Sequence, residues 1–273
     1  MTSANASPPA HDVVGPITRT VEVACLVAAA LLLLVHGVRL ITRLELTWWL
    51  PAVIAAAGAA ADLVSGLVHW TADTWGRESL PVVGRRFLRP FRVHHINPHD
   101  FLRRDFIDCN GDVAMLVLPM LTAALLIPLD STWNEVAAVF LVSLAAWTLP
   151  TNQVHQWAHM PDPPRLVAWL QRRGVILSRE AHREHHASPY VVNYCIATGW
   201  CNTWLTRRRV FARLERTIFR VTGMLPRADE QEFATGLIRG TLSPGPPYTL
   251  ARGDPDAPLR SRGSLASARS RRL

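Results

Sequence analysis

The segment LPAVIAAAGAAADLVSGLVHWTAD, residues 50–73, joins a long apolar run to a histidine and a carboxylate. Between residues 50 and 68 its only polar side chains are Asp62 and Ser65. A run of this kind is about as long as a helix needs to cross the roughly 30 Å hydrocarbon core of a bilayer. His69 and Asp73 follow four residues apart, which puts them on one face of a helix. The segment therefore predicts a membrane-spanning helix with polar chemistry at one end.

Three other apolar blocks have a comparable length, at residues 21–35, 113–129 and 136–150. We expect four spanning helices, at about residues 21–41, 48–69, 113–129 and 135–155. Pro119 and Pro128 interrupt the third block, and Asp112 is a candidate N-cap for its helix. A soluble bundle of buried helices is disfavoured, because the first two blocks contain so few polar residues. No cleavable signal peptide is expected, since the first block begins late and lacks a basic region before it.

The predicted fold is an all-α, four-helix transmembrane bundle with a cytoplasmic histidine-rich helical cap. We expect it to occupy residues 19–240, between a disordered tail at 1–18 and a disordered basic tail at 241–273 that is rich in Pro, Gly, Ser and Arg. The loop at 76–111 is too long for an idle connection, which is a sign of function. Residues 163–177 mix apolar residues with arginines, as a helix lying in the membrane interface would; a surface helix of a soluble domain would look similar.

Arginine predicts the orientation, because the chain contains no lysine. One Arg precedes the first apolar block, two lie between the first and second, and none lies between the third and fourth. Seven lie in residues 77–104 and nineteen follow residue 160. The positive-inside rule therefore places both termini and the central loop in the cytoplasm, as for a multi-pass protein of a bacterial inner membrane. No nucleic-acid partner is expected, since the arginines form no single stripe interleaved with aromatic residues.

Nine of the eleven histidines lie between residues 69 and 186. They form four short groups: HWTAD (69–73), RVHHINPH (92–99), HQWAH (155–159) and HREHH (182–186). In a helix, residues three or four apart share a face, whereas neighbours diverge by about 100°. The first, third and fourth groups can therefore each present one face, while the adjacent His94 and His95 reach a common site only from different sides of it.

The order of the membrane crossings tests, independently of the helical spacing, whether the four histidine groups can lie on the same side of the membrane. His69 ends the second crossing, and the central loop with His94 and His95 follows it. The third crossing leaves this membrane face and the fourth returns, ending at about His155. All four histidine groups are thus predicted to meet at the cytoplasmic face of the membrane.

About eight imidazoles and a carboxylate exceed what one metal ion takes, so two metals fit the count better. Imidazole-rich sites suit Zn, Cu, Fe and Ni. A zinc protease is disfavoured because neither HExxH nor HxxEH occurs, and a haem would use only two of the histidines. The four cysteines include no CxxC pair, so we expect reduced thiols and no zinc knuckle. Two irons open to a bilayer suggest oxygen activation for attack on an unactivated lipid C–H bond.

Five stretches hold these groups and the loop between them: GLVHWTADTWG (66–76), RPFRVHHINP (89–98), DFIDCNGD (105–112), NQVHQWAHM (152–160) and HREHHASPYVVNYCIATGWCN (182–202). Together they resemble the Kua/CarF-type plasmanylethanolamine desaturases, whose superfamily also includes a plant plastid desaturase acting on phosphatidylglycerol. The likeness runs from about residue 60 to residue 225 and leaves out both tails.

The resemblance implies a membrane enzyme with two iron ions that uses O2 and two electrons from a cytochrome or ferredoxin-type donor. Its product would be a plasmalogen, formed by introducing the vinyl ether double bond into 1-O-alkyl-2-acyl glycerophosphoethanolamine. The family's metal-ligand pattern falls on His69, Asp73, His94, His95, His155, His159, His182, His185 and His186. Asp73 is either a ligand or the partner that orients His69.

One position departs from the family pattern. Relatives often carry a histidine just before the DF of the loop motif, where this chain has Arg104. Either that position is not a ligand, or the nearby His99 replaces it, or the activity is altered. Two other functions stay open: a desaturase or hydroxylase acting on an acyl chain of another phospholipid, and a non-enzymatic membrane metal-binding protein.

Overall fold

The computed structural model describes residues 14–77, 79–81, 83–187 and 190–227, together with two short strands. These strands, β1 (Tyr248–Thr249) and β2 (Arg260–Ser261), pair antiparallel inside the segment predicted to be a basic tail. The remaining residues of both predicted tails lie outside the described residues, apart from 14–18. The described helices are α1 (Pro16–Arg43), α2 (Leu50–Thr74), the π-helix η1 (Gly84–Leu88), α3 (Arg89–Ile96), α4 (Pro98–Leu102), α5 (Phe106–Leu125), α6 (Thr132–Thr148), α7 (Thr151–His159), α8 (Arg165–Arg172), α9 (Arg179–His185), α10 (Asn202–Arg207) and α11 (Val210–Thr222).

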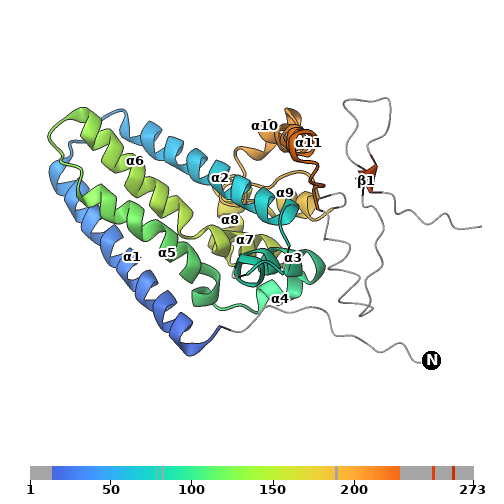
Figure 1. Ribbon diagram of the computed structural model, residues 1–273. Helices are drawn as coiled ribbons and strands as arrows, with labels where there is room; N and C mark the ends of the chain where they lie inside the picture. Colours follow the sequence, from blue (N-terminus) through green and yellow to red (C-terminus); the bar gives the residue numbers. More distant parts are fainter. Residues whose placement is uncertain are drawn as a thin grey trace, which may run out of the picture.

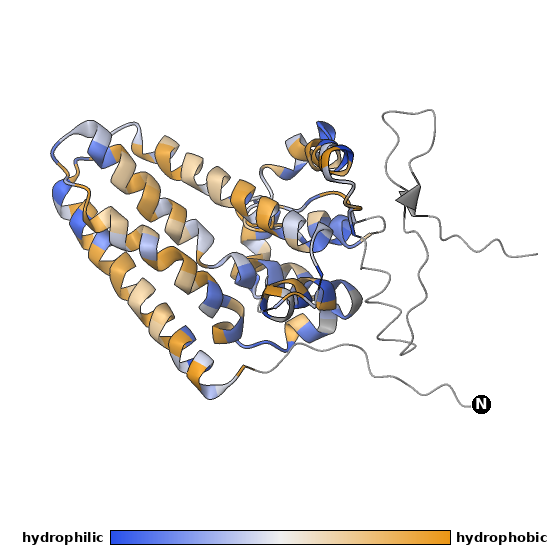
Figure 2. Cartoon of the chain, viewed as in Figure 1, coloured by the Kyte–Doolittle hydropathy of each residue, from blue (hydrophilic) through white to orange (hydrophobic). Residues whose placement is uncertain are grey.

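Four stretches are long and apolar enough to cross a membrane: α1, α2, α5 and the run Thr132–His159 formed by α6 and α7. This confirms the predicted all-α bundle of four spans. α1 packs along α5 and α2 along α6, and Figure 1 shows the four long helices side by side with the short helices gathered at one end. Figure 2 shows hydrophobic residues over the bundle and hydrophilic residues concentrated among the short helices, which we call the cap.

Three spans, α1, α5 and α6, begin earlier than their apolar blocks, and α6 does so at Thr132. α1 begins at Pro16, because proline fits the first helical turn, where its missing N–H has no intrahelical partner. α5 begins at Phe106, and its N-cap is Asp105 rather than the predicted Asp112: the Asp105 carboxylate accepts the backbone N–H of Asp108 at 2.9 Å. The same carboxylate accepts hydrogen bonds from both Arg19 Nη atoms at 3.0 and 3.1 Å, so this N-cap residue also ties α5 to α1.

Prolines do not divide the third span. Pro119 lies within α5, which continues to Leu125. The fourth span instead breaks at Pro150, between α6 and α7, and its last turn reaches His159 rather than stopping at His155. α7 therefore carries two histidines from the end of a spanning segment into the cap.

A polar face runs down α2, where Asp62, Ser65, His69 and Asp73 follow one another at spacings of three or four residues. Asp62 is fully buried, and its carboxylate accepts the backbone N–H groups of Thr198, Gly199 and Cys201 at 2.7–2.9 Å. Ser65 Oγ accepts the N–H of Ile196 at 3.1 Å. Buried polar groups in a spanning helix need such partners. The backbone N–H groups of the segment 194–202 supply them, and these hydrogen bonds hold the segment against α2.

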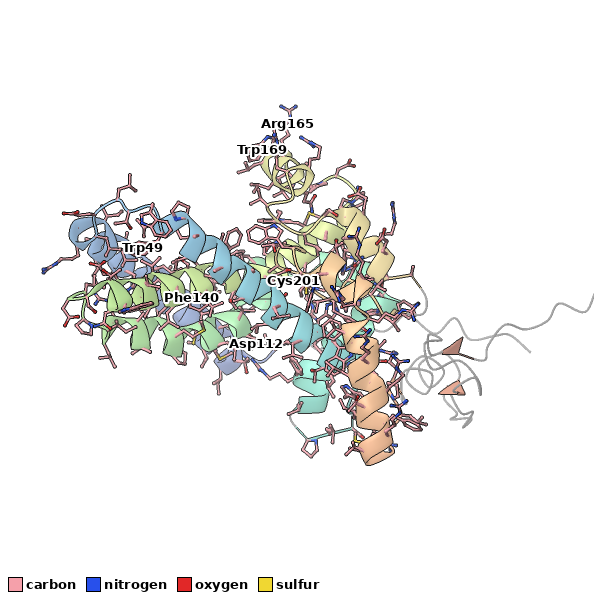
Figure 3. All side chains as sticks on the ribbon, turned by 90° about the horizontal axis from the view of Figure 1, so that it is seen from above. Trp49, Asp112, Phe140, Arg165, Trp169 and Cys201 are labelled. Atoms are coloured by element: carbon pink, nitrogen blue, oxygen red, sulfur yellow. The ribbon has the colours of Figure 1, made fainter. Side chains whose placement is uncertain are left out.

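Helix α8 stands out from the side of the bundle, and Figure 3 shows Arg165 and Trp169 at its outer end. Val167 and Gln171 are buried on the inner face of α8, whereas Leu166 is 66% exposed and Trp169 is 46% exposed. An apolar outer surface with arginines beside it is typical of a helix that lies in the membrane interface. The interfacial position predicted from the sequence stays a prediction.

Gly66 allows the segment 194–202 to approach α2. A Cβ at this position would lie 2.4 Å from Cys195 Sγ and 3.2 Å from the Cys195 backbone nitrogen. We expect Gly66→Ala to lower the free energy of unfolding by about 1–3 kcal/mol, because the added methyl overpacks a contact with backbone.

Gly37→Ala in α1 is the matched control, since no atom lies within 4 Å of a Cβ built there. It should be neutral or stabilising by up to about 1 kcal/mol, as expected for alanine in a helix. Thermal unfolding of both variants in detergent micelles measures the difference. Equal unfolding temperatures for the two variants would show that the contact between α2 and Cys195 is not close packed.

Candidate metal centre

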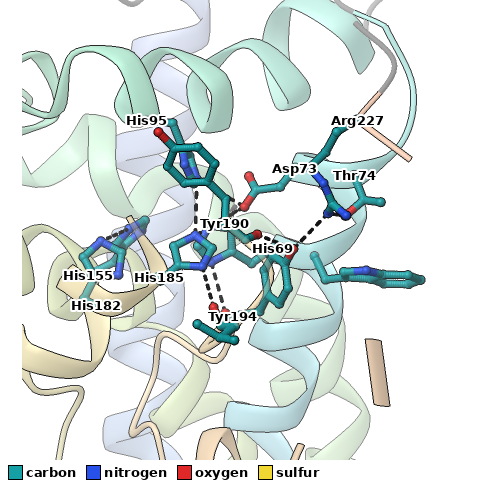
Figure 4. A network of polar contacts seen from close by, with 12 residues as sticks. His69, Asp73, Thr74, His95, His155, His182, His185, Tyr190, Tyr194 and Arg227 are labelled. Atoms are coloured by element: carbon teal, nitrogen blue, oxygen red, sulfur yellow. Dashed lines mark hydrogen bonds and ion pairs between the residues drawn. The ribbon is translucent and has the colours of Figure 1, made fainter. Parts of the chain in front are cut away.

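The nine side chains predicted from the family pattern meet where α2, α3, α7 and α9 converge in the cap; Figure 4 shows six of them. His69 and Asp73 come from the last turns of α2, His94 and His95 from α3, and His155 and His159 from α7. His182 and His185 lie on α9, and His186 is its C-cap. They form two groups whose ligand atoms lie within 4.8 Å of one another: His94, His155, His159, His182 and His186 in the first, and His69, Asp73, His95 and His185 in the second.

The first group contains imidazoles only. His182 Nε2 lies 3.0 Å from His155 Nε2 and 2.7 Å from His159 Nε2. His182, His155 and His94 are at most 4% exposed. One N–H on His182 satisfies only one of its two neighbours, so hydrogen bonding alone leaves lone pairs facing each other. Metal–nitrogen bonds of about 2.0–2.1 Å put ligands at right angles about 3 Å apart, which matches these separations.

The second group is built around a carboxylate. Asp73 Oδ2 lies 3.2 Å from His69 Nε2, 3.2 Å from His95 Nε2 and 3.4 Å from His185 Nε2. His95 Nε2 and His185 Nε2 are themselves 3.2 Å apart. The carboxylate thus faces the inner nitrogens of three imidazoles at once, so it lies among the donor atoms of the second group and not behind the His69 ring.

Two pairs of adjacent histidines connect the groups. His94 and His186 belong to the first group, while their chain neighbours His95 and His185 belong to the second. Because neighbouring helical side chains diverge by about 100°, each pair sends one ring to each group. The His95 and His186 rings stack across the boundary with centroids 4.5 Å apart. The two candidate metal positions are therefore adjacent.

Backbone carbonyls orient two of the rings. His69 Nδ1–H donates to the Tyr194 carbonyl at 3.0 Å, and His185 Nδ1–H donates to the Val192 carbonyl at 2.8 Å. Since a carbonyl only accepts, each ring carries its proton on Nδ1 and directs the Nε2 lone pair at Asp73. The loop after α9 thus fixes the tautomers of the second group.

Burial keeps these histidines neutral. Desolvation, followed by the neighbouring imidazoles, lowers the pKa of His94, His182 and His186 well below the usual value. Desolvation also lowers the pKa of His185 to about 4. At neutral pH all four are therefore unprotonated, which is the form that binds metal.

The donor atoms fit metal ions better than they fit one another. Several of these side chains have buried donor or acceptor atoms with no hydrogen-bond partner in the described structure, among them His69 Nε2, both Asp73 oxygens, His94 Nε2 and His186 Nε2. Such groups are costly to bury unless something else binds them. Two transition-metal ions, one in each group, would satisfy all of them.

A buried ion pair behind the second group was missed by the sequence analysis. Arg227 and Glu215 are each 1% exposed, and Arg227 Nη2 lies 2.5 Å from Glu215 Oε2. Arg227 Nη1 also donates to Tyr194 Oη at 3.1 Å and to Thr74 Oγ1 at 3.2 Å, next to Asp73 (Figure 4). Trp70 Nε1–H completes the cluster by donating to Glu215 Oε1 at 2.9 Å. No motif in the sequence marks Glu215 or Arg227, because the pairing depends on the fold.

Arg104 belongs to neither metal group. Its side chain lines a cavity of about 50 Å³ together with His94 and His155, and its guanidinium lies 5.7 Å from the centroid of the Phe101 ring. The two groups are formed without a side chain from this position. The side chain of His99 lies outside the described residues, so its predicted role is not addressed.

Comparisons with known proteins identify the family of this chain. The family model described as a lipid desaturase domain matches residues 59–229, which include both metal groups and the Glu215–Arg227 pair. The plasmanylethanolamine desaturase of Myxococcus xanthus is 41% identical over 216 residues, or 79% of this chain and 77% of the relative.

Two further relatives extend the comparison. Plasmanylethanolamine desaturase 1 of Mus musculus is 42% identical over 207 residues, covering 74% of this chain and 76% of the relative. Fatty acid desaturase 4, chloroplastic, of Arabidopsis thaliana is 37% identical over 182 residues, covering 65% and 54%. No solved structure matches the chain.

Because the donor atoms form two groups, substitutions in one group should remove only the metal ion of that group. We expect the purified chain to hold about two transition-metal ions, and the double variant Asp73→Ala/His95→Ala to hold about one, because three imidazoles and a carboxylate are the donors of one position. Metal analysis of protein purified in detergent measures this. The control is His36→Gln, which removes a buried histidine that bonds to the Leu121 carbonyl outside both groups. A double variant that keeps two ions would contradict the assignment.

Breaking the buried Glu215–Arg227 ion pair should lower the stability of the protein more than replacing an exposed arginine of α11 does. Arg227→Ala should lower the free energy of unfolding by about 3–5 kcal/mol, because it leaves the Glu215 carboxylate buried without its cation. Arg220→Ala on the exposed face of α11 should change it by less than about 0.5 kcal/mol. Replacing both partners, as Glu215→Gln/Arg227→Met, should recover part of the loss. If the single and double variants unfold alike, the pair does not hold the cap together.

Proposed function

The chain belongs to the lipid desaturase family, and we propose that it is a plasmanylethanolamine desaturase. In this proposal it introduces the vinyl ether double bond into 1-O-alkyl-2-acyl glycerophosphoethanolamine. The observation that carries the proposal is the pair of adjacent buried donor groups at the end of a four-helix apolar bundle. The identity of 41–42% to two relatives named as such desaturases supports the choice of substrate.

Two iron ions are proposed as the cofactor, held by the eight histidines and Asp73. Imidazole-rich donor sets suit iron among other first-row metals, and the two adjacent positions match the need for two electrons. When bound, the irons supply the oxidising chemistry with O2. The overall reaction removes two hydrogen atoms from neighbouring carbons and reduces one O2 to two waters, using two protons and two electrons. We propose a cytochrome or ferredoxin-type protein as the electron donor.

The residues of the chain have three tasks in this reaction. Burial of both donor groups keeps water from the reacting carbons. The carbonyls of Tyr194 and Val192 keep the Nε2 atoms of His69 and His185 directed at the metal. The spanning helices beside the centre bring the lipid chain to it from the bilayer. Positioning of this kind is the protein's share of a cofactor-driven reaction.

We further propose that the protein lies in a bacterial inner membrane with both termini and the metal centre on the cytoplasmic side. Support comes from the distribution of arginine, with seven in residues 77–104 and nineteen after residue 160. The histidine groups lie at the ends of α2 and α7, on the side of the bundle that these arginines occupy. An electron donor in the cytoplasm would reach the centre from this side.

A second candidate function has one specific observation in its favour. The relative from Arabidopsis thaliana is named a fatty acid desaturase and is 37% identical. The same centre would then act on an acyl chain of another phospholipid. The substrate test below separates the two functions, and a non-enzymatic metal-binding protein would convert neither lipid.

The test uses a host that makes alkyl ether lipids but no plasmalogens. Expression of the chain should give acid-labile vinyl ether lipid, and His155→Ala should abolish it, because His155 lies at the centre of the first group. Metal analysis should find about two irons per chain. The proposal is wrong if the chain and His155→Ala give identical lipid profiles, and unsaturation confined to acyl chains would favour the second candidate.

A further inference from the structure

A cavity of about 330 Å³ adjoins the metal centre on the membrane side. It shares Pro90, Phe91, Arg104 and Asn152 with the smaller cavity that His94 and His155 line. We call the larger space the entry cavity and the smaller one the inner cavity. The two adjoin, so a bound molecule can occupy the first and reach the first metal group through the second.

The entry cavity has an apolar side that faces the bilayer. Val68 of α2 and Leu116 of α5 line it, and these residues of spanning helices are 39% and 69% exposed. Phe87 and Phe91 continue the apolar wall toward the inner cavity. A lipid chain can therefore enter sideways from the membrane.

Charged groups of both signs also line the entry cavity. Glu22 of α1 is 2% exposed and lies at ion-pair distance from Arg86, with 3.7 Å between Oε1 and Nη2. Arg86 also pairs with Asp112. Arg104 Nε lies 3.9 Å from Asp108 Oδ2 and makes no hydrogen bond within the described structure. The cavity thus carries three carboxylates and two guanidinium groups.

Glu22 lines the entry cavity and has an unsatisfied carboxylate oxygen. Its side chain lies over Gly111, where an added Cβ would come within 2.5 Å of Glu22 Cγ. Its Oε2 atom accepts no hydrogen bond in the described structure. A buried carboxylate near a membrane interface needs a cation or a donor, and the ion-pair contacts to Arg19 and Arg86, at 3.6 and 3.7 Å, are too long for hydrogen bonds.

We propose that the entry cavity is a head-group site for a zwitterionic phosphoethanolamine lipid, an inference that rests on the proposed function and assigns its specificity. The phosphate binds Arg86 and Arg104, and the ammonium group binds Glu22 and Asp112. Three carboxylates against two guanidinium groups disfavour an anionic head group that has no ammonium. The chemistry that recognises the substrate is thus a pair of opposite charges set side by side.

The distance to the metal centre agrees with this placement. In the proposed substrate only six bonds separate the phosphorus from the first alkyl carbon, and a fully extended chain of six bonds spans about 7 Å. The phosphate must therefore bind close to the metal ligands. Arg104 meets this condition, because it lines the inner cavity together with His94 and His155.

The test measures binding and turnover separately with the metal-loaded full chain in detergent micelles. Binding of 1-O-alkyl phosphatidylethanolamine and of the matching phosphatidylglycerol is measured by native mass spectrometry. We expect the ethanolamine lipid to bind about tenfold more tightly or better, and Glu22→Gln to remove most of this preference, as for loss of one charge-assisted hydrogen bond. Arg104→Gln should weaken binding of both lipids.

Glu135→Gln is the matched control, since Glu135 lies in the first turn of the spanning helix α6 and does not line the cavity. Retained metal content checks that each variant is folded; if Glu22→Gln loses its metal, Asp112→Asn takes its place. Equal binding of both lipids by the unaltered chain overturns the head-group site even if vinyl ether is made. So does a preference that survives Glu22→Gln or, where that variant loses its metal, Asp112→Asn. A preference without any vinyl ether product overturns the proposed function and leaves the site standing.

Discussion

The carboxylate of Asp62 sets the constraint on which the cap depends. It lies inside a spanning helix, fully buried, and accepts three backbone N–H groups from residues 198–201. A charged group in this setting has few other ways to be satisfied. The bonds fix the segment 194–202 against α2, and that segment supplies the Tyr194 carbonyl that orients His69. An interaction about two helical turns before His69 thus determines how this imidazole is presented to the second group.

Burying so many polar donor atoms in the metal centre is unfavourable for folding. Nine donor side chains converge, six of them buried and three half-buried, and several of their inner atoms have no hydrogen-bond partner among the described residues. Burial keeps the imidazoles neutral, so repulsion between protonated rings is avoided at neutral pH. The Glu215–Arg227 pair closes the opposite side of the second group and contacts Tyr194. The centre is therefore held by hydrogen bonds and ion pairs around it, so that its donor atoms are left for metal.

Much of this arrangement could be predicted because it repeats at helical spacing. The four spans followed from length and apolarity, and the convergence of the histidine groups followed from counting crossings. The division into two groups was less accessible, because it depends on the side to which each of His94, His95, His185 and His186 points. The face Asp62–Ser65–His69–Asp73 could have been recognised from its spacing, and it would have indicated a partner segment. The Glu215–Arg227 pair could not, since the two residues meet only through the turn after α11.

Arg104 shows how a departure from a family pattern is interpreted once its surroundings are known. In the sequence it departs from the expected family pattern just before the DF of the loop motif, which raised a question about metal binding. In the structure its backbone carbonyl accepts Gln156 Nε2–H at 2.9 Å, and its side chain lies in the wall between the entry and inner cavities. A histidine there would occupy the same wall, with a shorter reach and a charge that depends on pH. Arginine keeps a permanent positive charge beside the first metal group without competing for metal. In the proposed head-group site this charge holds the lipid phosphate, and the two donor groups form without a histidine at position 104.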